Sequence, residues 1–172
     1  MCDDRGPGRQ VAVARIRFDD PQVQTLVARV QEEYVVRYGS PDDTPFDGSV
    51  FEPGAGAFFV ATEAGAAVAM GGWRFRGDVS ALGGRRTAEL KRMYVVPEAR
   101  RHGLARVVLA HLERTAAREG ADLMVLETGI EQPEALALYE ATGYVPVPKF
   151  GHYAWSPKSR CLGKRLSRRT RL

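Results

Sequence analysis

The chain contains 172 residues, of which 44% are hydrophobic and 27% are charged. This balance is typical of a globular domain and excludes a disordered chain. No apolar run reaches the about 18 residues that a membrane span needs, and the opening MCDDRGPGRQ lacks the apolar stretch of a signal peptide. We therefore expect a soluble, cytoplasmic protein with no membrane partner.

The basic charge is concentrated at the end of the chain. The whole sequence has 25 basic and 21 acidic residues, a net charge of +4. Seven basic residues and no acidic ones fall in residues 158–172, which leaves 18 basic and 21 acidic residues, a net charge of −3, in residues 1–157. Basic tails are more often solvated than bound to phosphates, so the charge pattern argues against a nucleic-acid partner.

The two cysteines, Cys2 and Cys161, lie near opposite ends of the sequence and have no CxxC spacing. This pattern predicts neither a disulfide scaffold nor a metal site. Because the sequence has no internal repeat and no long linker, it predicts a single domain over residues 9–167, followed by a basic C-terminal tail over residues 168–172.

A strand and a helix are predicted first. Residues 11–18 alternate as a strand does. Asp20 then supplies an N-cap and Pro21 suits the first helical position, while Gly39 ends the helix near Tyr38.

Three strands are expected next. A loop over residues 39–57, rich in proline and glycine, is long enough to cross a site. It leads to two β-rich runs, residues 57–65 and 66–77, which the turn Glu63-Ala64-Gly65 joins as a hairpin. The run AELKRMYVVP then predicts a fourth strand that ends at Pro97, since proline cannot extend a ladder.

The last part of the chain adds two helices and three strands. Leu104 starts an apolar set at helical spacing that stops at Gly120, and LMVLETG predicts a buried strand. Pro133 opens a helix that ends at Gly143, and the short strands YVPV and SRCLGKRL complete the chain. The order βαβββαβαββ predicts an α/β or α+β fold, a mixed and mostly antiparallel sheet of about seven strands flanked by helices.

The most informative stretch is the predicted strand–turn–helix segment from Val95 to Arg106. Backbone N–H groups at a helix start, aided by the helix dipole, form an anion site, and Gly103 lets a phosphate approach the backbone. Arg100, Arg101 and Arg106 add positive charge. These features predict a phosphate-binding turn; the alternative is an ordinary helix start with surface arginines.

The same stretch carries a family signature. RRHGLA fits the pattern R-x-x-G-x-A, and the longer segments ELKRMYVVPEARRHGLA and QPEALALYEATGY resemble the strand–turn–helix unit and the later helix of the GNAT superfamily of acetyl-CoA-binding N-acetyltransferases. The resemblance covers about residues 10–167 and includes the order of the elements. It is not a dinucleotide or nucleoside-triphosphate loop, because Ala105 replaces a third glycine and no Lys-Ser/Thr follows.

The resemblance implies that acetyl-CoA lies between the fourth and fifth strands as the acyl donor, with no metal. The fourth-strand backbone would pair with the pantetheine arm, and the turn would hold the pyrophosphate. The residues implied in these contacts are Met93, Tyr94, Val95, Arg100, Arg101, His102, Gly103, Leu104, Ala105, Arg106 and Gln132. The superfamily usually has asparagine where Gln132 stands, which makes the coenzyme contact there a departure from the pattern.

Tyr139 matches the tyrosine that lies near the thioester sulfur in the superfamily, where it can protonate the leaving thiolate. A positioned hydroxyl can give its proton to a forming thiolate, so the chemistry is feasible. The alternative is a buried tyrosine that bonds to backbone. The oxyanion of the reaction would be stabilised by the backbone N–H of Tyr94 or Val95.

An alkylammonium must lose a proton before it attacks a carbonyl, which calls for a base. Glu89, at the start of the fourth strand, is where the superfamily often places one, although its neighbours Lys91 and Arg92 make a surface ion pair the alternative. Glu127, at the end of the apolar fifth strand, is the second candidate, because apolar surroundings raise a carboxyl pKa. A glutamate that only caps backbone is the alternative there, and both candidates stay open.

Aromatic residues near carboxylates suit a cationic amine. The candidate walls of an acceptor site, near the acidic pair Asp42-Asp43, are Tyr34, Tyr38, Trp73, Phe150 and Tyr153. Each of them singly also fits a core or surface position.

Together these observations predict an N-acetyltransferase that moves acetyl from acetyl-CoA to a primary amine of a small molecule or peptide. The transfer would be direct and sequential, because neither cysteine occupies a position for a covalent intermediate. Two alternatives stay open: a catalytically silent acyl-CoA-binding sensor or interaction module, and an acyltransferase that prefers a longer or acidic acyl group. Analogy with the superfamily also suggests a homodimer built through the last strands.

Overall fold

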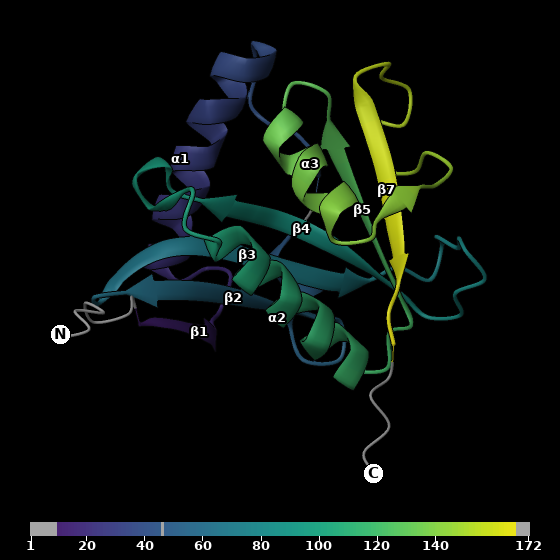
Figure 1. Cartoon of the computed structure of the whole chain (residues 1–172), viewed down its shortest axis with the longest axis horizontal. Coiled ribbons are helices and arrows are strands. Elements are labelled where there is room, and N and C mark those ends of the chain that lie inside the picture. Colours follow the sequence, from purple (N-terminus) through teal and green to yellow (C-terminus); the bar gives the residue numbers. More distant parts are fainter. Residues whose placement is uncertain (1–9, 46, 168–172) are drawn as a thin grey trace, which may run out of the picture.

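The computed structural model describes residues 10–45 and 47–167 (Figure 1). Residue 9, Cys2 and the basic tail at residues 168–172, all named in the sequence predictions, lie outside this part of the chain. In chain order the elements are β1 (Val11–Arg15), α1 (Pro21–Tyr38), the 3-10 turn η1 (Gly48–Phe51), β2 (Gly56–Glu63), β3 (Ala66–Phe75), β4 (Thr87–Val95), the 3-10 turn η2 (Pro97–Ala99), α2 (Leu104–Arg118), β5 (Leu123–Gly129), α3 (Pro133–Ala141), β6 (Val145–Pro146) and β7 (Ser159–Arg165).

The strands form one seven-stranded sheet in the order β1-β2-β3-β4-β5-β7-β6. Each neighbouring pair is antiparallel except β4 and β5, which are parallel. The predicted fold class and the order βαβββαβαββ are therefore confirmed. The hairpin between β2 and β3 also turns where expected, at Ala64 and Gly65, which both have positive φ.

Local signals fix the ends of α1. The Asp20 side chain accepts a hydrogen bond from the Gln22 amide at 2.8 Å, and Pro21 is the first helical residue. At the other end Gly39 has φ +81° and donates its N–H to the Val35 carbonyl. The first strand ends at Arg15, earlier than the alternation to residue 18 predicts, because the chain turns there towards the helix cap.

The core lies on both faces of the sheet. Helix α2 crosses one face, where it packs on β3 and β4, and α1 lies behind the opposite face (Figure 1). The amphipathic spacing explains this packing, since α1 buries Val23, Leu26 and Val30 while α2 buries Val108 and Leu112. Within the described residues, none of the helices is both long and apolar enough to cross a membrane.

The parallel strands β4 and β5 stay together only briefly. Residues 87–89 pair with residues 123–125, after which β4 follows β3 to Val95 and β5 follows β7 to Gly129. A bulge in β4 accompanies the separation, because Arg92 has φ +57° and the register with β3 shifts there. The two strands diverge towards their carboxyl ends (Figure 1).

Candidate active site

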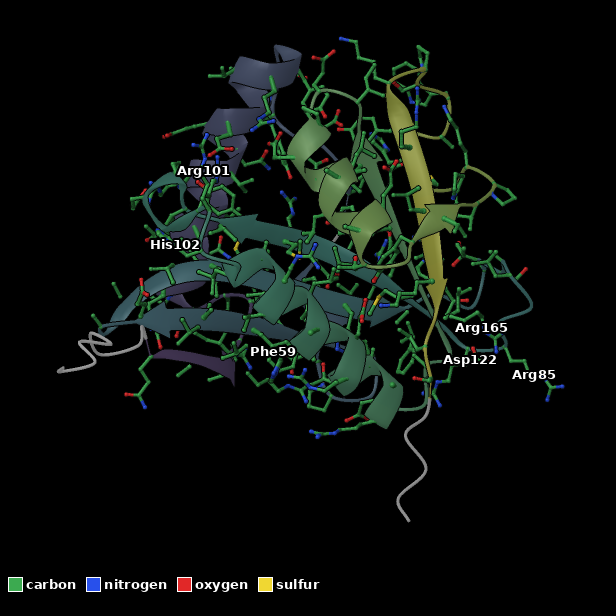
Figure 2. The ribbon with its side chains drawn as sticks, viewed as in Figure 1. Phe59, Arg85, Arg101, His102, Asp122 and Arg165 are labelled. Carbon is green, nitrogen blue, oxygen red and sulfur yellow. The ribbon has the colours of Figure 1, made fainter. Side chains whose placement is uncertain are left out.

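The turn that precedes α2 is open and left-handed. Arg101 has φ +65° and Gly103, the N-cap, has φ +75°, and neither the cap nor its neighbours provide a side chain that bonds to the first amides of the helix. A β-carbon added at Gly103 would meet no other atom within 4 Å. Arg101 and His102 are exposed beside this turn, at the end of the sheet where β4 stops (Figure 2). The turn therefore presents the N–H groups and positive dipole of a 15-residue helix to solvent, as an anion site requires.

The Arg100 side chain contacts residues of α1 and β4. Its Nη2 donates to Glu33 of α1 at 2.5 Å and its Nε donates to the Val95 carbonyl at 2.9 Å. The guanidinium also lies 5.6 Å from the centre of the Tyr94 ring. The Arg100 side chain therefore joins α1 to the end of β4, and its contact with the pyrophosphate stays a prediction. Arg101 and Arg106 are exposed near the start of α2.

The peptide groups at the end of β4 face alternate sides. Val96 donates to the Val68 carbonyl of β3 at 3.0 Å, so strand alternation also turns the Tyr94 peptide towards β3. The Val95 peptide then faces the edge that β5 has left, and its carbonyl accepts the hydrogen bond from Arg100 there. Of the two amides considered for an oxyanion, only that of Val95 lies on the open edge.

Tyr139 is a buried residue of α3 whose ring packs edge-on against Tyr144, with 5.5 Å between centroids. Burial raises the pKa of its hydroxyl above the usual value, and the nearby Tyr34 adds to the effect. No residue in the described part of the chain accepts or donates a hydrogen bond at this hydroxyl. The bond to backbone that was the alternative for Tyr139 is therefore not present, and the hydroxyl keeps its proton for another partner.

Glu89 lies inside an ion-pair network. Its side chain is 2% exposed and accepts hydrogen bonds from Arg74 at 2.9 Å and Arg76 at 2.6 Å, with the Lys91 ammonium 3.7 Å away. The alternative of an ion pair is thus correct for Lys91, but the pair is buried rather than on the surface. Both guanidinium groups bind the same carboxylate oxygen, Oε2, and Glu89 is not among the residues that line the cavity described below.

Glu127 has a different environment, at the carboxyl end of β5. Burial raises its pKa above the usual range, although a hydrogen bond from Ser159 Oγ at 3.1 Å and the charge of Lys91 act in the opposite direction. Its side chain lines the cavity described next. A half-buried carboxylate with a raised pKa and open access to a cavity has the properties of a general base.

A cavity of about 290 Å³ lies between the end of α1, the middle of β4 and the end of β5, and two loops cover it. This volume is close to the lower limit for small-molecule sites. The side chains and backbone that line it are Tyr34, Tyr38, Ser40, Pro41, Asp42, Thr44, Lys91, Glu127, Thr128, Gly129, Gln132, Tyr153, Trp155, Ser156, Lys158 and Ser159. The structure thus brings Glu127 together with three of the predicted aromatic walls, Tyr34, Tyr38 and Tyr153.

Two of the predicted walls lie elsewhere. Trp73 is 1% exposed in the core, where its indole donates to Thr115 at 3.0 Å. Trp73 lies on the face of β3 that α2 covers, which keeps it away from the cavity. Phe150 lies outside the lining, with its ring 5.7 Å from the Arg76 guanidinium and its carbonyl near the Cys161 thiol.

A glycine shapes the floor of the cavity. The hydroxyl of Tyr38 lies so close to Gly129 that a β-carbon there would overlap it. Gln132 donates to the same hydroxyl at 3.2 Å, so its side chain lines the cavity and connects the start of α3 to the end of α1. The departure from the superfamily asparagine therefore falls on a residue with a structural partner of its own. Beside it, burial raises the pKa of Tyr34 to about 12.

The two covering loops are tied to one another. The Tyr153 hydroxyl bonds to Asp43 at 2.5 Å and to Asp42 at 3.2 Å, and His152 Nε2 lies 3.1 Å from Asp43. The long loop after α1 lines this cavity through Ser40, Pro41, Asp42 and Thr44.

Sequence reasoning missed several lining residues, above all Lys91 and Trp155. Trp155 is 77% exposed, and a tryptophan in a glycine- and proline-flanked loop was the available signal. Lys91 gave none, since the sequence offered it only as a neighbour of Glu89.

These observations define a mixed sheet with an open, left-handed turn at the start of α2 and a small, carboxylate-bearing cavity at its divergent strands. Residues 23–144 match the acetyltransferase (GNAT) family, which is more than half of the chain. The chain belongs to this family, and the resemblance drawn from the RRHGLA segment is confirmed.

Individual relatives are more distant. An IAA acetyltransferase of Azospirillum brasilense is 37% identical over 78 residues, which are 45% of this chain and 51% of that protein. The match thus spans about half the length of the curated relative. A candidate acyl-CoA N-acyltransferase from Klebsiella pneumoniae is similar over 92% of this chain and 99% of its own, with a TM-score of 0.72 and 26% identity. An aminoglycoside N-acetyltransferase in complex with CoA shares the fold over 86% of this chain and 95% of its own, with a TM-score of 0.63 and 18% identity.

Proposed function

We propose that this protein transfers an acetyl group from acetyl-CoA to a primary amine of a small molecule. The observation that carries the proposal is the divergence of β4 and β5. The open N-terminus of α2 follows the carboxyl end of β4, and the cavity bearing Glu127 lies at the carboxyl end of β5. The turn at Gly103 fits a pyrophosphate, and the open edge of β4 at Val95 fits an extended arm.

Each catalytic group would move one proton. The amine nitrogen bonds to the acetyl carbonyl carbon while the carbon–sulfur bond of the thioester breaks. The acceptor ends with two protons fewer than its ammonium form: one leaves through Glu127 to solvent, and the other balances the proton that Tyr139 gives to the sulfur. The N–H of Val95 would stabilise the oxyanion.

Glu127 is the proposed base because it lines the cavity and has a raised pKa, whereas Glu89 is held by Arg74 and Arg76. Glu89 is proposed instead as a structural residue that fixes the start of β4 beside β3. Cys161 is not proposed as a nucleophile: it is buried, burial raises its pKa, and its thiol donates to the Phe150 carbonyl and to Glu127 Oε2.

A calorimetric titration with acetyl-CoA tests the donor site, with Gly103→Ala and Gly103→Glu as a matched pair. Both variants carry the same strain of a side chain at φ +75°, and neither side chain starts against another atom. Only the glutamate adds bulk and negative charge in front of α2. We expect Gly103→Ala to bind nearly as well as the wild type and Gly103→Glu to lose binding.

Equal binding by the two folded variants would remove the turn from the donor site. A wild-type protein that binds acetyl-CoA but releases no CoA with any primary amine would instead support the silent-sensor alternative.

A further inference from the structure

The charged side chains that line the cavity differ in how many hydrogen bonds and ion pairs they make with other residues. Asp42 accepts hydrogen bonds from Thr44 and Tyr153 and pairs with Arg92 at 3.6 Å, which holds its loop in place. Lys158 is half exposed at the rim and pairs with Glu131 at 3.4 Å. Two charged groups remain that face the cavity with less demand from the protein, Glu127 and Lys91.

Lys91 is the less expected of the two. Its side chain is 13% exposed, and in the described residues its ammonium makes no hydrogen bond; its one ion-pair contact is Glu89 at 3.7 Å. Glu89 does not depend on that contact, because Arg74 and Arg76 bind it at 2.9 and 2.6 Å. A largely buried ammonium with three unused donors is an anion-binding group.

Lys91 and Glu127 share the cavity without pairing to each other. In the part of the chain that the structure describes, no ion pair within 4.0 Å joins them, although both line the same space. Both side chains line the same cavity of about 290 Å³, so one small ligand can reach both of them. A ligand with one cationic and one anionic group would satisfy both.

We propose that the amine acceptor also carries a carboxylate, which Lys91 binds while Glu127 faces the amine. This inference rests on the proposed function and names the class of its acceptor: free amino acids. The rings of Tyr34, Tyr38, Tyr153 and Trp155 form the remaining walls and would contact the apolar body of the acceptor.

The test compares each of the common L-amino acids with its own α-carboxamide, with CoA release as the readout. The amide keeps the size and the amine but loses the charge, and its amine has the lower pKa, which favours the amide as a nucleophile. A preference for the acid is therefore a property of the site. For the best acceptor, we expect kcat/KM to be at least ~10-fold higher for the acid, since a site built to bind a charged group discriminates against an analogue that lacks it.

Lys91→Met removes the charge at nearly constant length. We expect the acid-to-amide ratio to fall to about one, with the change mainly in KM for the acid. The ratio excludes an indirect effect through Glu127, because a change in the base alters the rates for both members of a pair alike. Circular dichroism checks the fold, which Arg74 and Arg76 should preserve around Glu89.

Arg85→Met is the control for loss of one positive charge. Arg85 is exposed in the turn before β4, near Asp122 and Arg165 and at the opposite end of that strand from Arg101 and His102 (Figure 2). Its ratio should stay at the wild-type value.

Equal rates with acid and amide in the wild type, or a ratio that survives Lys91→Met, would overturn this inference and leave the acetyltransferase proposal standing. No CoA release with any of these acceptors, from protein that binds acetyl-CoA, would overturn the inference. If other primary amines also fail, the proposed function falls with it.

Discussion

Changing each candidate glutamate to glutamine should have opposite effects: the change at Glu127 should lower turnover, and the change at Glu89 should lower stability. Glu127→Gln keeps the size of the side chain, and an amide oxygen can still accept the hydrogen bonds that Ser159 and the Cys161 thiol donate to the carboxylate. Burial already disfavours the charge at this position, so the free energy of unfolding should change by less than about 1 kcal/mol. Turnover should fall by about 10²–10⁴-fold, the usual contribution of a general base.

Glu89→Gln removes the one carboxylate that lies between Arg74 and Arg76. Breaking a buried ion pair on one side typically costs about 3–5 kcal/mol because the other charge stays uncompensated. For a chain of this size that is a fall in Tm of roughly 6–20 °C. Arg76 also pairs with Asp78 at 2.7 Å, and both arginines are partly exposed, which places the expected loss at the lower end of this range.

The assay pairs thermal unfolding, followed by circular dichroism, with CoA release measured well below the Tm of each variant. The predicted pattern is a stable, inactive Glu127→Gln and a destabilised Glu89→Gln that keeps most of its turnover while folded. The opposite pattern, a folded and inactive Glu89→Gln beside an active Glu127→Gln, would refute the assignment of the base.

Three further predictions follow from single contacts. Tyr139→Phe should lower turnover by about 10²-fold or more. Acetyl-CoA affinity in calorimetry and stability in thermal unfolding should stay nearly unchanged, because the hydroxyl has no protein partner in the described structure. Unchanged turnover would remove the role of Tyr139 as the acid. Ser159→Ala removes a bond that lowers the pKa of Glu127, and since the base must be deprotonated, the rise of kcat with pH should move to higher pH; a profile that stays in place would contradict this. Asp122→Ala frees the amides of Arg85 and Arg86, which it binds at about 2.9 Å, and should cost about 1–3 kcal/mol in urea unfolding with normal activity. Those bonds hold the Asp122 pKa below its usual value, so its contribution is full above the unfolded pKa and is lost as the pH falls through the folded one; a difference that persists at the lowest pH would count against the bonds as its source.

Local patterns in the sequence predicted much of the fold. Asp20, Pro21 and Gly39 act through contacts within a few residues, so the bounds of α1 could be predicted from the chain itself. The same is true of the turn at Gly103, where a glycine before an apolar helical pattern signals a left-handed cap. The order of the elements along the chain agreed with the family, whereas the order of the strands within the sheet comes from the structure.

The acceptor site could be predicted only in part, because it is made by segments far apart in the sequence. Trp73 and Tyr153 are both aromatic residues in β-rich or turn-rich stretches, and no local signal says that one packs under a helix and the other covers a cavity. The partner of Arg100 could not be predicted for the same reason, since Glu33 is 67 residues away. Lys91 could be recognised as a candidate only once the structure showed that Arg74 and Arg76 bind Glu89.

The short pairing of β4 with β5 divides the sheet into two antiparallel blocks, residues 11–95 and 123–165, which share three residue pairs. Each block is laddered along its own length, whereas the seam between them is held by few backbone hydrogen bonds. A molecule that lies along the open edge of β4 and reaches the cavity at β5 would contact both blocks and hold them together. Amide hydrogen exchange at the carboxyl ends of both strands should then slow together when the donor binds, which makes substrate occupancy a property of the whole sheet.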